Sequence, residues 1–231
     1  MSSPNTCQNQ KQVASILGSL QHITVIYQQG RTHLPALSRF LSKFPNVHIL
    51  HHIPTNVMHE LKWWSCTLTV PNPTRSLTPL PALDLDIWVD ASMSVRVGIL
   101  IDNRWSAWYL TPGWNSNGRD IGWAEAVVIE LVVVWLASNG LHDGCLTVNC
   151  DNTSVIQSIW KGHSRNPWHN NCLLRISSCL AASNLTINPC YAQSGFNKVD
   201  GLSRGILCAP ELRLRPSVTV PVSLSSYLVQ L

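Results

Sequence analysis

The stretch LDIWVDASMSVRVGIL, which covers Leu85–Leu100, has the pattern of a core strand that ends in a carboxylate. Ile87, Trp88 and Val89 favour a strand, and apolar residues return after the short break DASMS. Asp90 ends the first apolar run, where a carboxylate without a partner is costly because it loses its hydration. We therefore expect Asp90 to share its charge with other groups that the fold brings to the same place.

The residues that follow predict an α/β (α+β) domain with a mixed sheet. Apolar runs at 87–89, 95–101 and 104–110 indicate three strands joined by short turns, which favours antiparallel pairing. Later strands alternate with helices, which favours crossovers and parallel pairing. We expect five strands flanked by helices. The later elements are predicted as a buried helix at 123–136, a strand at 146–150, helices at 153–161 and 172–183, a strand at 185–192 and a short helix at 197–203.

The residues before this domain predict a small, mainly helical segment at 1–70. Apolar residues recur at helical spacing in 12–28, 34–44 and 57–68. A proline-rich stretch at 71–83 is interpreted as a linker, with the main domain at 84–205. The proline-spaced residues 206–231 are interpreted as a tail or linker.

Composition narrows the class of protein. The chain is 45% hydrophobic and 12% charged, which is typical of a globular protein rather than a disordered one. Its net charge of +4 is compatible with a polyanionic partner. Eight cysteines without a CxxC pair, and a polar start without a secretory signal, favour an intracellular protein that is not secreted. The longest apolar run, 126–137, is shorter than the roughly 20 residues that span a bilayer, so no membrane is expected.

Four of the twelve acids stand at unusual places. Asp90 and Asp151 each end a predicted strand, Glu125 lies in the first turn of the buried helix, and Asp200 follows the last strand. Strand ends of this kind meet at one edge of an α/β sheet. Converging carboxylates are best balanced by hard divalent cations, so we expect two Mg²⁺ ions, with Mn²⁺ as a substitute and no organic cofactor.

The segments that carry these acids resemble the ribonuclease H domain of a retroelement reverse transcriptase. They are WVDAS, WAEAVVIEL, VNCDNTSVI and NKVDGLSRG, and the details are similar to fungal members of the tyrosine-recombinase and pararetrovirus-like types. The resemblance covers 84–205. It implies a ribonuclease H-like fold and an endonuclease that cleaves the RNA strand of RNA·DNA hybrids, with Asp90, Glu125, Asp151 and Asp200 as metal ligands.

The segments ILGSLQHIT, GRTHLPALSRFL and LKWWSCTL are similar to the thumb and connection region of the same family. The polymerase motif Tyr-x-Asp-Asp does not occur in the sequence, so no polymerase activity is expected. A separate polymerase-bearing chain is therefore an expected type of partner, beside the RNA·DNA hybrid.

Each acid also has an ordinary structural role open to it. Asp90 suits a turn, Asp151 and Asp200 suit helix caps, and Glu125 suits a helix first turn. Glu130 competes with Glu125, but the two lie about 140° apart on a helix, so only one can face the site. We favour Glu125.

Six further residues are candidates for contacts with nucleic acid. Backbone groups near Ser92 and Asn152 would contact the RNA 2′-hydroxyl, and Asn197 would shape the turn before Asp200. The three cations would contact phosphates, although a solvated loop is an equally good interpretation for each of them. The six are Ser92, Asn152, Lys161, Arg165, Asn197 and Lys198.

Three other functions remain open at this point. The same fold could serve a related nuclease, integrase or exonuclease. The chain could be an inactive or domesticated retroelement fragment that binds nucleic acid without cleaving it. Residues 1–83 could serve to dock on nucleic acid or on another subunit.

Overall fold

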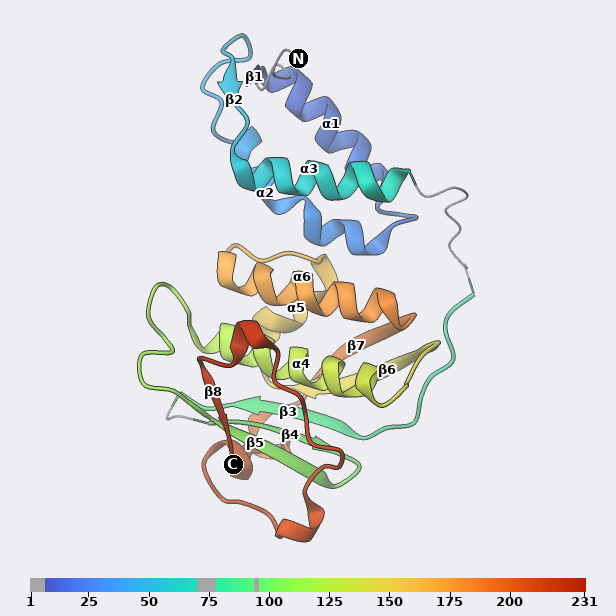
Figure 1. The fold of residues 1–231 in the computed structure, drawn as a ribbon, viewed down its shortest axis with the longest axis vertical. Coiled ribbons are helices and arrows are strands. Elements are labelled where there is room, and N and C mark those ends of the chain that lie inside the picture. The colour runs from blue at the N-terminus through green and yellow to red at the C-terminus, as the bar shows by residue number, and fades with distance from the viewer. Residues whose placement is uncertain (1–6, 70–77, 94–95) are drawn as a thin grey trace. The chain divides into compact units, whose positions relative to one another are not determined.

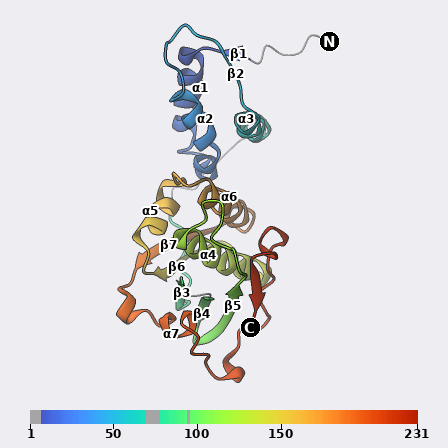
Figure 2. The same cartoon turned by 90° about the vertical axis from the view of Figure 1, so that its left-hand side faces the viewer.

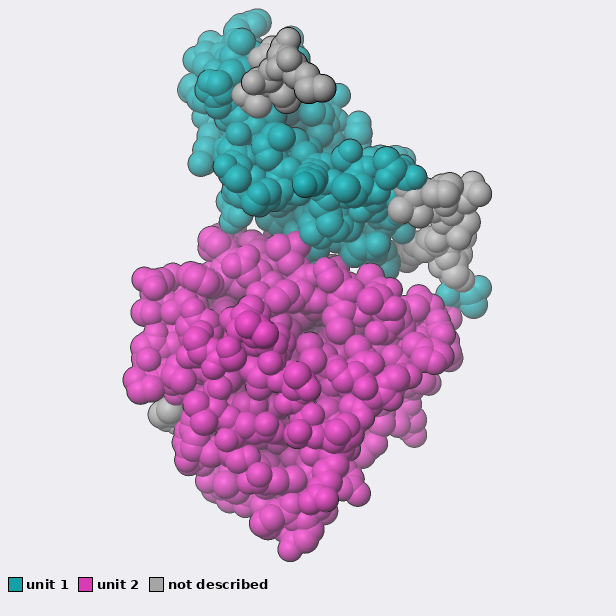
Figure 3. Space-filling view, viewed as in Figure 1, with its two compact units in different colours: residues 1–78 teal, residues 79–231 magenta. Residues whose placement is uncertain are grey.

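The computed structural model describes residues 7–69, 78–93 and 96–231 (Figure 1). The chain divides into two compact units, Met1–Thr78 and Pro79–Leu231, which Figure 3 shows in teal and magenta. This division falls inside the stretch 71–83 that the sequence suggests as a linker. Residues 71–77 of that stretch lie outside the described residues.

Unit 1 is a small helical domain with a core of its own. Trp64 is 1% exposed, and its indole nitrogen donates to the backbone oxygen of His33 over 2.9 Å. Gly30 lies against the same ring, because a Cβ at this position would stand 2.2 Å from it. The elements are β1 (Cys7–Gln8), α1 (Gln10–Ile23), the 3₁₀ helix η1 (Gln28–His33), α2 (Pro35–Leu41), β2 (His51–His52) and α3 (Thr55–Leu68).

Unit 2 is a mixed α/β domain, which confirms the predicted fold class. Its strands are β3 (Ile87–Ala91), β4 (Arg96–Ile101), β5 (Arg104–Leu110), β6 (Gly144–Cys150), β7 (Leu185–Tyr191) and β8 (Leu228–Gln230). Their order in the sheet is β7-β6-β3-β4-β5-β8. The β3–β6 and β6–β7 pairs are parallel and the others are antiparallel, because short turns join β3, β4 and β5 whereas helices precede β6 and β7.

Helices cover both faces of this sheet (Figure 2). Helices α4 and α6 lie on one face, and the short helix α7 packs against β3 and β4 on the other. The helices are α4 (Ile121–Ser138), α5 (Thr153–Lys161), α6 (Pro167–Ala182) and α7 (Asp200–Ser203), with 3₁₀ turns η2 (Ser194–Phe196), η3 (Pro210–Leu212) and η4 (Val222–Leu224).

Helix α4 is the centre of the core. It begins after Asp120, whose side chain accepts from the backbone N–H of Trp123, and 13 of its residues are buried. By length and composition alone, this helix of 18 residues would be long enough to cross a membrane. It is longer than the apolar run 126–137, which by itself predicts no membrane span. Most of the helix is buried inside the unit, however, which is typical of a core helix in a soluble domain.

Two expectations about the end of the chain are wrong. The sheet has six strands rather than five, and residues 206–231 fold onto unit 2 instead of leaving it. Strand β8 pairs with β5, and Leu214, Val218, Leu224 and Leu228 are buried in the main core. The apolar residues of this tail are spaced by prolines and follow neither helical nor strand periodicity, so the sequence pattern does not reveal their burial.

Candidate functional site

The sheet brings the predicted acids to one edge. Strands β3 and β6 are parallel neighbours, so Asp90 near the end of β3 and Asp151 directly after β6 lie at the same edge. Glu125 comes from the second turn of α4, and Asp200 begins α7, which packs against β3. Asp151 and Asp200 are near enough to Asp90 to affect its ionisation, and Asp90 and Asp151 affect that of Glu125.

Asp90 is nearly excluded from water and is held by two neighbours. It is 5% exposed, the hydroxyl of Ser203 donates to its Oδ2, and the side-chain amide of Asn197 lies 3.4 Å from its Oδ1. Burial raises the pKa of Asp90 to about 6 against the hydrogen bond from Ser203, and the charges of Asp151 and Asp200 act in the same direction as burial.

Glu125 is the most enclosed of the four acids. It is 2% exposed, and its Oε1 accepts from the backbone N–H of Ala91 over 3.1 Å. The thiol of Cys150 donates to its Oε2 over 3.7 Å. Burial, followed by the charges of Asp90 and Asp151, raises the pKa of Glu125 well above its usual range.

Glu130 lies elsewhere in the core. It is 1% exposed and accepts from Nε and Nη2 of Arg175 on α6, at 2.6 and 2.8 Å. The structure thus places Glu125 with the other acids and Glu130 in an ion pair between two helices. This is the angular separation that helical geometry requires of residues five positions apart.

Asp151 and Asp200 are more open, and each has a polar partner. The hydroxyl of Ser194 donates to Oδ2 of Asp151 over 2.7 Å. Both carboxylate oxygens of Asp200 accept from Nε of Arg204 at 2.8 Å, within one turn of chain. Since the Arg204 side chain is 66% exposed, it offers limited charge compensation to the enclosed acids.

This cluster could hold a metal ion. One ligand atom each from Glu125, Cys150 and Asp151 lie within 4.8 Å of one another, and Asp90 adds its charge to the group. Crowded, buried carboxylates with raised pKa values are stabilised by a cation. Burial strongly raises the pKa of the Cys150 thiol, so the neutral thiol serves as a donor to Glu125 and the oxygens remain as ligands for a hard cation.

Two of the residues expected to contact nucleic acid have structural roles for their side chains. Asn197 is 6% exposed, and its amide donates to the backbone oxygen of Val89 over 3.1 Å, so the expectation that it contacts nucleic acid directly is corrected. Asn152 caps α5 by accepting from the backbone N–H groups of Ser154 and Val155. Asn197 therefore positions the acid-bearing strand, and Asn152 fixes the helix that follows Asp151.

The other four candidates lie nearer the surface. Lys198 pairs with Asp86 over 2.7 Å, and Lys161 lies 3.5 Å from a side-chain oxygen at the exposed end of α5. Arg165 is exposed in the loop before α6. Ser92 is half-buried just after β3, and its N–H donates to a β4 carbonyl.

Sequence reasoning misses an exposed aromatic side chain beside the acids. Phe196 is 77% exposed although it belongs to the short turn η2. That turn is fixed on both sides, because Ser194 bonds to Asp151 and Asn197 lies on Asp90. The sequence feature that could have revealed it is a single phenylalanine within the otherwise polar segment QSGFNK, four positions before Asp200.

The comparisons with family models and with curated proteins add no relative to this description. No protein-family model matches the chain, and no curated protein matches it. The site is therefore described from its own residues. Its four acids come from β3, α4, α7 and the end of β6, and two of them, Asp90 and Glu125, are buried.

Proposed function

We propose that unit 2 is a divalent-metal-dependent endonuclease that hydrolyses the RNA strand of RNA·DNA hybrids. The observation that carries this proposal is the convergence of Asp90, Glu125, Asp151 and Asp200 at one sheet edge, with the first two nearly excluded from water. The resemblance of the surrounding segments to the ribonuclease H domain of retroelement reverse transcriptases supports the choice of substrate.

The donor set suits two Mg²⁺ or Mn²⁺ ions, since the ligands are carboxylate oxygens. Asp90 and Asp151 would be the main ligands. Asp90 would serve both ions because its ionisation is coupled to that of the other three acids. Glu125 would complete one site and Asp200 the other. A bound pair of ions would activate water and stabilise the leaving 3′-oxygen of the RNA.

The chain's own groups keep the acids in place. Ser203 and Asn197 hold Asp90 from the α7 side, and the N–H of Ala91 fixes one oxygen of Glu125. Such fixed ligands lower the reorganisation that binding and reaction would need.

Selection of RNA would come from contacts with the 2′-hydroxyl. The backbone near Ser92 and Asn152 is suited to this role because each lies within two residues of an acid, Asp90 or Asp151. The exposed cations Lys161 and Arg165 would meet phosphates farther along the hybrid.

Unit 1 would serve as a connection to a polymerase-bearing chain. Its three α-helices stand where the sequence resembles the thumb and connection region. Such a partner, together with a hybrid substrate, would place the protein inside the cell, in the cytoplasm or nucleus.

The test is cleavage of an end-labelled RNA·DNA hybrid by the full chain, in Mg²⁺, in Mn²⁺ and in chelator. We expect cleavage of the RNA strand only, lost in chelator and in Asp151→Asn. Glu211→Gln is the matched control, because it makes the same change at an exposed acid of the tail. Cleavage of duplex DNA or of single strands would instead indicate one of the related nucleases.

A non-cleaving nucleic-acid-binding fragment is the second candidate. It is favoured by the ion pair of Arg204 with Asp200, which occupies both carboxylate oxygens of one proposed metal ligand. Binding of the hybrid without cleavage, unaffected by Mg²⁺ or by Asp151→Asn, would establish that function and reject the nuclease.

A further inference from the structure

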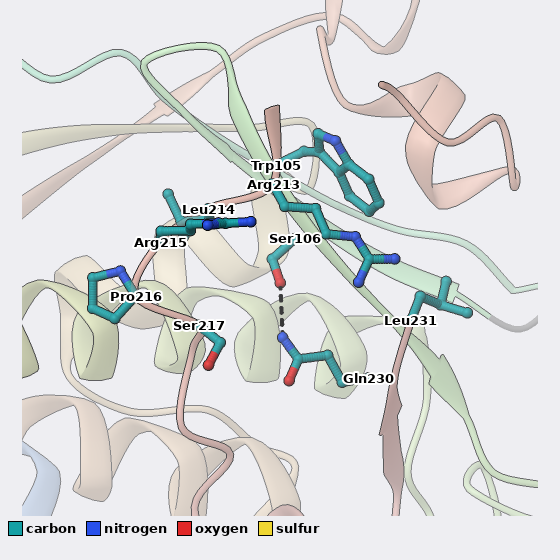
Figure 4. Close-up of a pocket in the computed structure, with 9 residues that line it drawn as sticks. All are labelled: Trp105, Ser106, Arg213, Leu214, Arg215, Pro216, Ser217, Gln230 and Leu231. Carbon is teal, nitrogen blue, oxygen red and sulfur yellow. Dashed lines mark hydrogen bonds between the residues drawn. The ribbon is translucent and has the colours of Figure 1, made fainter. Parts of the chain in front are cut away.

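The tail residues that the sequence presents as a linker help to form a pocket on unit 2, away from the acids. The pocket has a volume of about 350 Å³, within the range of small-molecule sites. None of the four acids lines it. Figure 4 shows its lining residues, which are Trp105, Ser106, Arg213, Leu214, Arg215, Pro216, Ser217, Gln230 and Leu231.

The pocket exists because two parts of the tail meet the same edge of β5. Leu214 donates its N–H to the backbone oxygen of Trp105 over 2.7 Å, and Leu231 donates to that of Ala107 over 3.0 Å. Ser106 lies between these two attachments, at the place that the tail leaves open. The walls are therefore held by backbone hydrogen bonds to a core strand.

The charged groups of the pocket are two arginines. Arg213 lies with its guanidinium 5.0 Å from the centre of the Trp105 ring, and Arg215 is exposed beside it. Neither forms an ion pair with any residue in the described ranges, and none of the nine lining side chains is acidic. The side chains that line the pocket thus supply two positive charges and no negative charge.

Neutral polar groups complete the lining. Ser106 is 5% exposed, and its hydroxyl accepts from the side-chain amide of Gln230 over 3.3 Å. In Figure 4 the side chains of Arg213 and Arg215 lie on either side of Ser106. A guanidinium fork matches the oxygens of a phosphate, and a hydroxyl and an amide can add neutral hydrogen bonds.

We propose that this pocket binds a phosphate group, carried by a free phosphorylated small molecule or by a nucleic-acid backbone. Two arginines match the two charges of a phosphate monoester, and a backbone phosphodiester, which carries one charge, can still accept hydrogen bonds from both guanidinium groups. The proposal is independent of the nuclease, because no acid of the metal-binding cluster contributes to the pocket.

The experiment is a calorimetric titration of the full chain with inorganic phosphate and with adenosine 5′-monophosphate. Chelator is present, so that metal ions at the acid cluster contribute nothing. We expect one saturable site, weakened about tenfold or more by Arg213→Gln and by Arg215→Gln, since each removes a charge-assisted hydrogen bond. Arg31→Gln, an exposed arginine of unit 1, is the matched control and should leave the affinity unchanged.

Competition identifies the source of the phosphate and tests the chemistry. Displacement of phosphate by a short oligodeoxynucleotide would support the proposal with the backbone as the source. Failure to displace it would support a free phosphorylated ligand. Acetate competing as well as phosphate, no saturable binding, or equal loss in Arg31→Gln would each overturn the proposal. Circular dichroism of the variants confirms that they fold.

Discussion

The surroundings of Asp90 shift its pKa in opposite directions. Its burial favours the protonated acid, whereas its hydrogen bond from Ser203 and the nearby charge of Arg204 favour the carboxylate. Burial has the larger effect and raises the pKa to about 6, so this carboxyl group changes its protonation state in mildly acidic solution. Stability of the metal-free protein should therefore depend on pH near neutrality.

We expect metal-free unit 2 to lose stability as the pH rises. The pKa of Asp90 is raised from 3.8 to about 6 on folding, so its stabilising contribution is complete below about pH 4 and is lost as the pH rises through about 6. Glu125 acts in the same direction. Thermal melts in chelator should show a falling Tm over this window.

The control for this prediction is Asp90→Asn, which should flatten the pH dependence. Added Mg²⁺ should raise the Tm more at pH 7.5 than at pH 5, because a cation binds the ionised acids. His33 of unit 1, whose pKa burial lowers to about 4, acts in the opposite direction, so the comparison with Asp90→Asn isolates the Asp90 effect. A Tm difference between the two proteins that does not change with pH would contradict the assigned direction of the shift.

Phe196 gives a prediction about substrate binding under the proposed function. An exposed aromatic side chain can stack on a base or sugar, which contributes about 1–3 kcal/mol per base. In the cleavage-deficient Asp151→Asn background, Phe196→Ala should weaken hybrid binding roughly tenfold. Phe196→Trp should retain the affinity. Equal affinity of all three proteins, measured by fluorescence anisotropy, would show that Phe196 does not contact the hybrid.

At this scale the sequence predicts the acids but few of their partners. Asp90 and Asp151 follow apolar strand runs, and that local pattern is sufficient to place them at one edge. Ser203, Cys150 and Arg175 become partners only through the packing of α7, β6 and α6, which no local pattern encodes. The pairing of Glu130 is unreadable for the same reason, although its separation from Glu125 follows from helical geometry.

Among the elements, the accuracy of prediction follows the strength of local signals. Helix α5 is predicted with its observed bounds, because Asn152 caps it and Gly162 ends it with a left-handed backbone conformation. Helix α6 begins at Pro167, five residues before the predicted start at residue 172. The prediction began too late because the first turn of the helix has no apolar stripe. The cap by Asn166 and the first-turn proline are the signals that would have corrected it.

The contact between α4 and α6 gives a prediction for the element scale. Arg175→Met leaves the carboxylate of Glu130 buried without its partner, and we expect a loss of about 3 kcal/mol in the free energy of unfolding. The double variant Glu130→Met, Arg175→Met should recover most of that loss, because an apolar pair needs no compensation. Urea denaturation followed by tryptophan fluorescence measures both. Equal losses in the single and double variants would contradict this account.

The whole molecule combines a predictable sheet with an unpredictable tail. The mixed sheet follows from the order of apolar runs, because hairpins give antiparallel pairs and helical crossovers give parallel ones. The division of the chain at Thr78 falls in the proline-rich stretch that suggests a boundary. The tail could not be placed, since its three-residue strand β8 is below the length at which alternation is recognisable.

The docking of β8 on β5 has a consequence for anyone who shortens the protein. A chain cut after Gly205, where the sequence suggests that the domain ends, would expose the outer hydrogen-bonding groups of β5 at Trp108–Leu110. An uncovered strand edge is a template for pairing with another molecule. We expect such a truncated protein to self-associate and precipitate, whereas the full chain stays monodisperse on size-exclusion chromatography. A soluble, monomeric truncated protein would show that β5 needs no cover.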